Sequence, residues 1–215
     1  MLSIAVDIQG PEVVKPFTKK FGVTFPVAVD TADVFGAAFG LKAIPVTFFV
    51  DEVGIVRLHG GGPNATLLRD IEELLAEPMM SVRGTQPQLP SAQSRADLEN
   101  RIAKSPEDWR SRLALARLHD EERRHPEAVA QLEAAVKLHP RSSEIQFAWG
   151  LAFLRQGQKE LALSRMKQAR DFDLENWRIR KQIWAIENPG KFYNVESPDY
   201  GWQKEQLERE KKGAD

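Results

Sequence analysis

The sequence predicts an α/β fold in its N-terminal part and an all-α array of helical repeats in its C-terminal part. Residues 1–76 alternate short β-branched runs with amphipathic stretches, as a sheet flanked by helices requires. Residues 77–93 contain prolines and small polar residues without periodicity, which is typical of a linker. Residues 94–186 follow a repeating helical pattern. We expect residues 187–215 to form an irregular tail of aromatic and charged residues, with a frayed helix over residues 204–215.

The N-terminal elements follow from local patterns. Apolar runs predict strands at residues 2–8, 25–29, 46–50 and 55–58, and a tight turn makes the last two an antiparallel hairpin. Apolar residues at helical spacing predict helices around residues 13–21, 34–39 and 67–75. Pro16 is expected to kink or break the first helix, because proline lacks the backbone N–H. Together these elements predict a small mixed sheet.

The composition excludes several functions. The chain of 215 residues has 30 basic and 31 acidic residues, so it lacks the basic surface that nucleic acids select. It contains no cysteine, which excludes thiol catalysis within these residues, and its four histidines lack metal-ligand spacing. We therefore expect no metal and no cofactor. No apolar run approaches the roughly 18 residues of a membrane span, and the absence of a secretory signal predicts a cytoplasmic location for the sequence as given.

Four N-terminal segments occur in an order that resembles the C-terminal two-thirds of thioredoxin-like redoxins. The segments are Phe25-Pro-Val-Ala-Val-Asp, Phe35-Gly-Ala-Ala-Phe-Gly-Leu, Ala43-Ile-Pro-Val-Thr-Phe-Phe-Val-Asp and Gly54-Ile-Val. The resemblance is greatest to the TlpA-like thiol–disulfide oxidoreductases and the peroxiredoxins. It implies that the peptide bond between Ile44 and Pro45 is cis. It also implies that this pair occupies the position that contacts substrate in the family.

The chain departs from the redoxin family at its start. The family begins with a strand and a Trp-Cys-x-x-Cys motif, and nothing before Leu2 supplies them. Either the cysteines lie upstream of Met1, or the fold closes without its catalytic part. The missing strand would lie between residues 2–8 and 46–50, whose backbone groups then need other partners. Direct pairing, cover from the linker or tail, and a strand from a second copy are the alternatives. We expect a homodimer, with the strands of Ile4 and Phe48 near the contact.

The C-terminal part repeats with a period of 34 residues. This step aligns Ala116 with Gly150, Ala128 with Ala162, Ala135 with Ala169 and Leu138 with Phe172. The pattern looks like the tetratricopeptide repeat (TPR), in which small residues let paired helices approach closely. It predicts repeats over residues 109–142 and 143–176, preceded by a single helix over 94–104.

A capping helix is expected after the second repeat. Its pattern predicts that Ile179, Ile183 and Trp184 are apolar contacts, while Arg178, Arg180 and Lys181 are solvated. The aromatic residues of the tail are expected to pack back onto the helices, because each would bury a large area.

The resemblance to the TPR implies a concave groove that binds a protein partner. Its candidate contact residues come from the first helix of each repeat: Arg110, Leu113, Arg117, Asp120, Glu144, Phe147, Leu151 and Leu154. A second interpretation is that this face packs against the linker, the tail or another copy. The functional hypothesis is a non-catalytic interaction module. The alternative is a fragment of a thiol–disulfide oxidoreductase or thiol peroxidase whose cysteines lie upstream of Met1.

Overall fold

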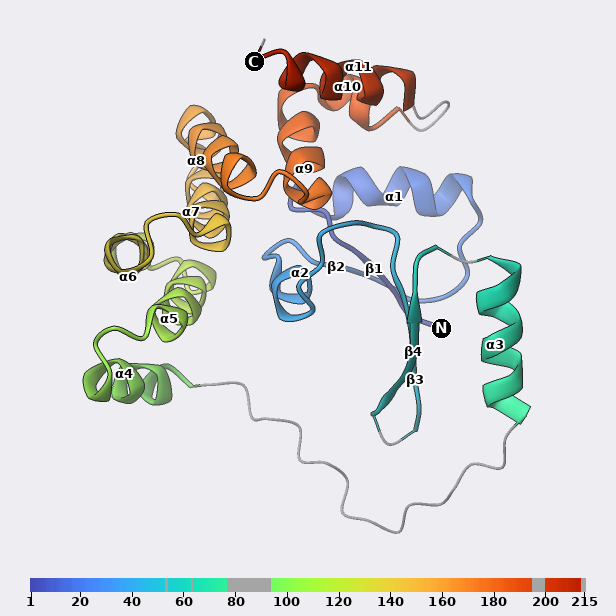
Figure 1. The fold of residues 1–215 in the computed structure, drawn as a ribbon, viewed down its shortest axis with the longest axis horizontal. Helices are drawn as coiled ribbons and strands as arrows, with labels where there is room; N and C mark the ends of the chain where they lie inside the picture. The colour runs from blue at the N-terminus through green and yellow to red at the C-terminus, as the bar shows by residue number, and fades with distance from the viewer. Residues whose placement is uncertain (53, 63, 77–93, 195–199, 214–215) are drawn as a thin grey trace.

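The chain folds into a small α/β part and a curved array of helices (Figure 1). The computed structural model describes every residue except 53, 63, 77–93, 195–199 and 214–215. The predicted linker therefore lies outside the described residues. The helical array, α4 to α9, curves around the N-terminal helix α2, and the last two helices lie beside α9 (Figure 1).

The α/β part contains four short strands and three helices. The strands are β1 (Ser3–Ala5), β2 (Val27–Val29), β3 (Thr47–Val50) and β4 (Val56–Gly60), and the helices are α1 (Pro11–Lys20), α2 (Val34–Ala38) and α3 (Ala65–Ala76). β1 and β2 are parallel, with Ser3 opposite Val27. β3 and β4 form the predicted antiparallel hairpin, with Phe48 opposite His59. The α/β class is thus confirmed.

The prediction of one mixed sheet is wrong in the described residues. The parallel and antiparallel pairs form two separate two-stranded sheets, and β1 does not pair with β3. No described strand lies between them to complete the hydrogen-bond ladder. Pro16 does not break its helix, since α1 continues through it to Lys20. Pro16 is exposed, so water can donate a hydrogen bond to the backbone carbonyl that lacks an N–H partner within the helix.

The C-terminal part consists of paired antiparallel helices, as the repeat predicts. The helices are α4 (Arg95–Lys104), α5 (Trp109–Glu121), α6 (His125–Leu138), α7 (Ser143–Arg155), α8 (Lys159–Phe172), α9 (Trp177–Glu187), α10 (Pro189–Phe192) and α11 (Tyr200–Lys211). Side-chain caps set the starts of the inner helices: Asp108 accepts a hydrogen bond from the Ser111 N–H, and Ser142 from the Ile145 N–H. Among the described residues, no helix is both long and apolar enough to cross a membrane.

Small residues lie where the paired helices cross, as predicted. Ala116, Ala128 and Ala162 are almost fully buried, and Gly150 is buried in the middle of α7. A Cβ atom at Gly150 would lie 2.6 Å from Met166 Cγ and 3.0 Å from the backbone oxygen of Ala162. The close approach of α7 and α8 therefore depends on the absence of a side chain at this position.

α10 and the start of α11 lie within residues 187–203, where irregular structure was predicted, and the rest of α11 lies where a frayed helix was expected. α11 packs beside α9, and the rings of Trp184 and Trp202 meet edge-to-face with centroids 6.1 Å apart. Glu210 accepts hydrogen bonds from Trp184 Nε1 at 2.7 Å and from Arg180 Nε at 2.6 Å. The aromatic tail thus covers the end of the repeat array, as its composition indicated.

Replacing Gly150 tests the repeat register. We expect Gly150→Leu to lower the free energy of unfolding by about 1–3 kcal/mol, because α8 leaves no space for the added atoms. Gly190→Leu is the matched control, since nothing lies within 4 Å of a Cβ atom at that helical glycine. Thermal and urea unfolding measure the difference. Equal stability of the two variants would show that the helix crossing is assigned wrongly.

Candidate protein-interaction site

The eight predicted groove residues come from the two inner helices, but the structure divides them into two groups. Leu113, Asp120, Phe147 and Leu151 are buried. Arg110 and Glu144 are exposed, and Arg117 and Leu154 are half-buried. Arg117 donates a hydrogen bond to Glu144 at 3.2 Å, which links the accessible edges of α5 and α7. The surface open to a partner is therefore smaller than the predicted groove.

The N-terminal part of the same chain covers the predicted groove at Asp120 and Leu151. Ala32, just before α2, lies against Asp120, Leu151 and Arg155 around a cavity of only about 10 Å³. Arg155 donates a hydrogen bond to the carbonyl oxygen of Thr31 at 3.3 Å and pairs with the Asp120 carboxylate. The concave face of the repeats thus already holds a turn of polypeptide, as the view of α2 inside the helical arc indicates (Figure 1).

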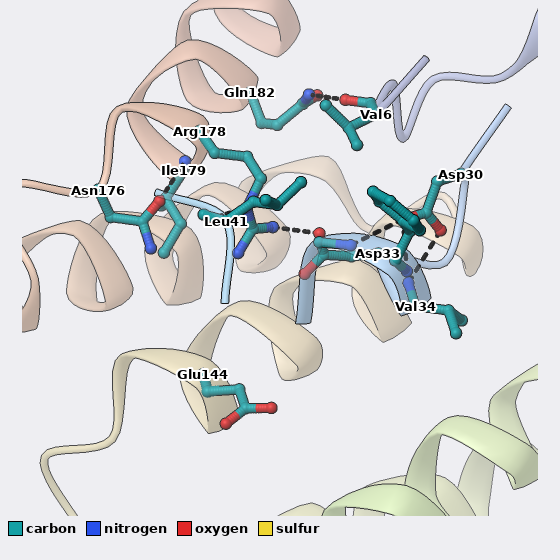
Figure 2. A network of polar contacts seen from close by, with 12 residues as sticks. Val6, Asp30, Asp33, Val34, Leu41, Glu144, Asn176, Arg178, Ile179 and Gln182 are labelled. Carbon is teal, nitrogen blue, oxygen red and sulfur yellow. Dashed lines mark hydrogen bonds and ion pairs between the residues drawn. The ribbon is translucent and has the colours of Figure 1, made fainter. Parts of the chain in front are cut away.

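Arg178, near the start of α9, is the main anchor between the two parts. Figure 2 shows its guanidinium directed at the carboxylate of Asp33, with which it forms an ion pair. Its Nε donates to the carbonyl oxygen of Leu41 at 2.8 Å, and its backbone N–H donates to that of Lys42 at 3.0 Å. The guanidinium also lies 5.2 Å from the ring centroid of Phe147, a distance that permits a cation–π contact.

Local backbone geometry brings Asp33 into this position. Asp33 has φ 57° and ψ 29°, the left-handed region, and its side chain makes no capping hydrogen bond to the helix that it precedes. The Asp30 carboxylate caps α2 instead, accepting from the N–H groups of Val34 and Phe35, both at 2.8 Å, and from Gly36 at 3.1 Å. A Cβ atom at Gly36 would collide with the Asp33 carboxylate, so glycine is required there.

The electrostatics of the Arg178 anchor are dominated by burial. The side chains of Arg178 and Asp33 are 9% and 4% exposed. Burial raises the pKa of Asp33 from 3.8 to about 6, although the positive charge of Arg178 opposes this increase. Because desolvation is the larger effect, the ion pair specifies how the two parts fit together more than it adds net stability.

A second set of hydrogen bonds holds the loop that follows β1. Gln182 of α9 donates to the carbonyl oxygen of Val6 at 2.8 Å (Figure 2). The Tyr193 hydroxyl donates to Asp7 at 2.7 Å and accepts from Gln9 Nε2 at 3.0 Å. Burial raises the pKa of Asp7, and the hydrogen bond from Tyr193 partly offsets that rise. α9 and Tyr193, at the end of α10, therefore hold the loop after β1, and α9 also holds the segment before β3.

The bond between Ile44 and Pro45 is cis, as the redoxin resemblance implied. Pro45 is exposed, and it lies three residues after Lys42, whose backbone carbonyl accepts a hydrogen bond from α9. Its ring lies against Gly62, where a Cβ atom would be 2.9 Å from Pro45 Cγ. This contact holds the loop in place, and Pro45 stays open to solvent.

The prediction that Arg178 and Arg180 are solvated is wrong. Arg178 is 7% exposed and Arg180 is 5% exposed. The N-terminal part covers Arg178, and α11 covers Arg180 through Glu210. Helical periodicity did not predict this, because it identifies the apolar face of a helix and not which elements pack on its polar face. Asn176 and Gln182, at the start of α9 and within it, are buried polar residues as well, and no local sequence pattern predicts their burial.

Comparisons with known proteins gave one match to a family model and similarity to curated relatives. The family model of the tetratricopeptide repeat matches residues 91–143 and 113–173, so the helical part carries tetratricopeptide repeats. The thiol-disulfide oxidoreductase ResA of Halalkalibacterium halodurans is 32% identical over 74 residues, which is 34% of this chain and 42% of the relative. ResA of Geobacillus thermodenitrificans is 36% identical over 55 residues, which is 25% of this chain and 32% of the relative.

The chain thus spans less than half the length of these curated relatives. The short stretch of similarity to thiol–disulfide oxidoreductases is consistent with a partial thioredoxin-like domain joined to tetratricopeptide repeats. No solved structure matches the chain.

Removing the Arg178 side chain tests the anchor. We expect Arg178→Ala to lower the free energy of unfolding by about 3–5 kcal/mol, because it leaves Asp33 buried without its charge partner. Lys42→Ala is the matched control. Lys42 also joins the two parts, through Asp173 at 3.1 Å, but its side chain is 57% exposed and its removal should cost less than about 1 kcal/mol. Similar losses in both variants would contradict a dominant role for Arg178.

The raised pKa of Asp33 predicts a pH dependence. Because the folded value of about 6 exceeds the unfolded 3.8, the folded protein holds this proton at pH 5 and the unfolded chain does not. Protonation therefore adds on the order of 1 kcal/mol to the stability of the wild type between pH 7 and pH 5. Asp33→Asn lacks this gain, so the stability difference between the two proteins should shift by that amount in urea unfolding. A difference independent of pH would refute the shift.

Proposed function

We propose that this chain is a non-catalytic interaction module in which tetratricopeptide repeats hold a thioredoxin-like part and bind a protein partner. The observation that carries the proposal is the concave face of the repeats, which already binds polypeptide at Thr31 and Ala32. A surface that recognises a turn of its own chain has the shape and polarity to recognise another. The absence of cysteine from the sequence supports a role without thiol chemistry.

The accessible part of the groove is the proposed partner site. Arg110 and Glu144 are exposed at the edges of α5 and α7, and Arg117 and Leu154 are partly open. Of the buried candidates, Asp120 and Leu151 lie beside Ala32 of the N-terminal part, whereas Leu113 and Phe147 belong to the core clusters of the repeats. Ile44 and Pro45 form a second contact position by resemblance to redoxins, because an exposed cis-proline loop there would meet an extended polypeptide.

Peptide selection tests the groove. A phage-displayed random peptide library panned on the whole chain should yield binders that lose at least tenfold in affinity for the double variant Arg110→Glu, Glu144→Lys. The matched control is Lys137→Glu, Glu99→Lys, which reverses exposed charges on α6 and α4. Failure to enrich any peptide would contradict the interaction function. Peptides that bind all three proteins equally would place the site outside the groove.

The similarity to ResA favours a second candidate, in which the chain is part of a thiol–disulfide oxidoreductase or thiol peroxidase with cysteines upstream of Met1. The DNA upstream of the start codon discriminates between the two. An in-frame strand followed by a Trp-Cys-x-x-Cys motif supports the oxidoreductase. Reduction of a disulfide-bonded substrate by the chain itself should show no turnover, and measurable turnover would refute the non-catalytic proposal.

We also propose that the chain forms a homodimer through its N-terminal part. The two unjoined two-stranded sheets support this, because exposed strand edges favour association and isolated pairs are marginally stable. Exposed apolar side chains on the hairpin, among them Val50, Ile55 and Val56, add apolar surface that a second copy would cover. Light scattering coupled to size exclusion should give twice the 24.3 kDa chain mass at micromolar concentration. A monomer would refute the dimer.

A further inference from the structure

An open cleft of about 430 Å³ lies between the two parts of the chain, at one end of the repeat groove. Its N-terminal side is formed by Ile8, Gln9 and Thr31, and its helical side includes Leu154 of α7 and Lys159 of α8. This volume falls within the range of about 300–1,000 Å³ that small-molecule sites occupy. The cleft is therefore large enough to hold a small organic molecule.

The cleft lies at the carboxyl ends of the two parallel strands. Gln9 follows β1 and Thr31 follows β2, so both come from loops that leave the same edge of the sheet. In open α/β sheets, ligands bind in the crevice outside the carboxyl ends of parallel strands. Here the repeat helices form the opposite wall, and a ligand would contact both parts of the chain.

One region of the cleft is apolar. Ile8 packs against the core cluster that contains Phe147 and Ile183, and Leu154 is half-buried beside it. Ile186 and Pro189, from α9 and α10, extend this apolar lining. A hydrocarbon chain that covers these side chains would be stabilised by about 25 cal/mol for each Å² of apolar surface removed from water.

The other region carries unneutralised positive charge. Two cations line the cleft, and no acidic residue does so among the described residues. The positive charge of Arg155 is balanced by Asp120. Lys159 is exposed and has no ion-pair partner in the described part of the chain. Lys159 therefore leaves a net positive charge beside apolar walls, which weaken screening by water and strengthen the attraction of an anion.

We propose that this cleft binds an organic carboxylate with a hydrocarbon chain. Lys159 pairs with the carboxylate, and Gln9 and Thr31 contribute polar groups on the opposite side. The hydrocarbon chain lies along Ile8, Leu154 and Ile186. The cleft shares Leu154 with the accessible part of the groove but does not include Arg110 or Glu144, so it does not require the groove to bind a protein.

Calorimetry with sodium octanoate and the full-length chain tests the proposal. We expect octanoate to bind. Acetate lacks the hydrocarbon chain and 1-octanol lacks the charge, so both should bind at least tenfold more weakly than octanoate. Lys159→Gln should weaken octanoate at least tenfold, whereas Lys137→Gln, at an exposed lysine on α6, should leave it unchanged. Because both lysines are exposed, both variants should keep the thermal stability of the wild type.

Three results would overturn the carboxylate site. One is the absence of octanoate binding, and another is equal binding of octanoate and acetate, which would indicate a simple surface charge. The third is equal binding of octanoate by the wild type and Lys159→Gln. The variant Arg110→Glu, Glu144→Lys should bind octanoate normally even where it fails to bind peptides, so the two proposals fail independently.

Discussion

The arrangement of the whole chain depends on one buried cation, the guanidinium of Arg178. A charge out of water is tolerated only with good partners, and Arg178 finds them in Asp33, in the carbonyl of Leu41 and on the face of Phe147. These contacts place α2 on the concave face of the repeats and hold the segment before Pro45. One residue of α9 thus joins the repeat core, the groove and the cis-proline loop.

This dependence is one-sided, because the N-terminal part has little core of its own. Of its described hydrophobic residues, Leu41 and Leu67 are the buried ones, and Leu41 belongs to the segment that Arg178 holds. The repeats instead contain two clusters of buried side chains. Since burial of apolar surface is the main favourable contribution to folding, the helical array acts as the scaffold, and the α/β part is held against it by polar contacts.

The end of the array is closed in the same way. A repeat array leaves an uncovered face at its last helix, which needs a cap. α11 supplies it here, with Glu210 bound to Arg180 and Trp184 and with Trp202 against Trp184. α9 is consequently covered on opposite sides by segments far apart in the sequence, and two of its arginines are buried although they occupy positions on its polar face.

The sequence by itself determined the features that depend on local spacing. The step of 34 residues placed Ala116, Gly150, Ala128 and Ala162 at the helix crossings. Two apolar runs joined by a tight turn predicted the β3–β4 hairpin. The candidate groove residues lie on α5 and α7, the first helices of the two repeats, but their accessibility was not predicted. Tertiary structure alone decided that the segment before α2 lies on the groove, that the two sheets stay separate and that Arg178 and Arg180 are buried. The physical reason is that periodicity shows which face of an element is apolar, whereas the partner of a polar face depends on contacts between residues far apart in the sequence, 137 positions for Arg178 and Leu41 and 30 for Arg180 and Glu210.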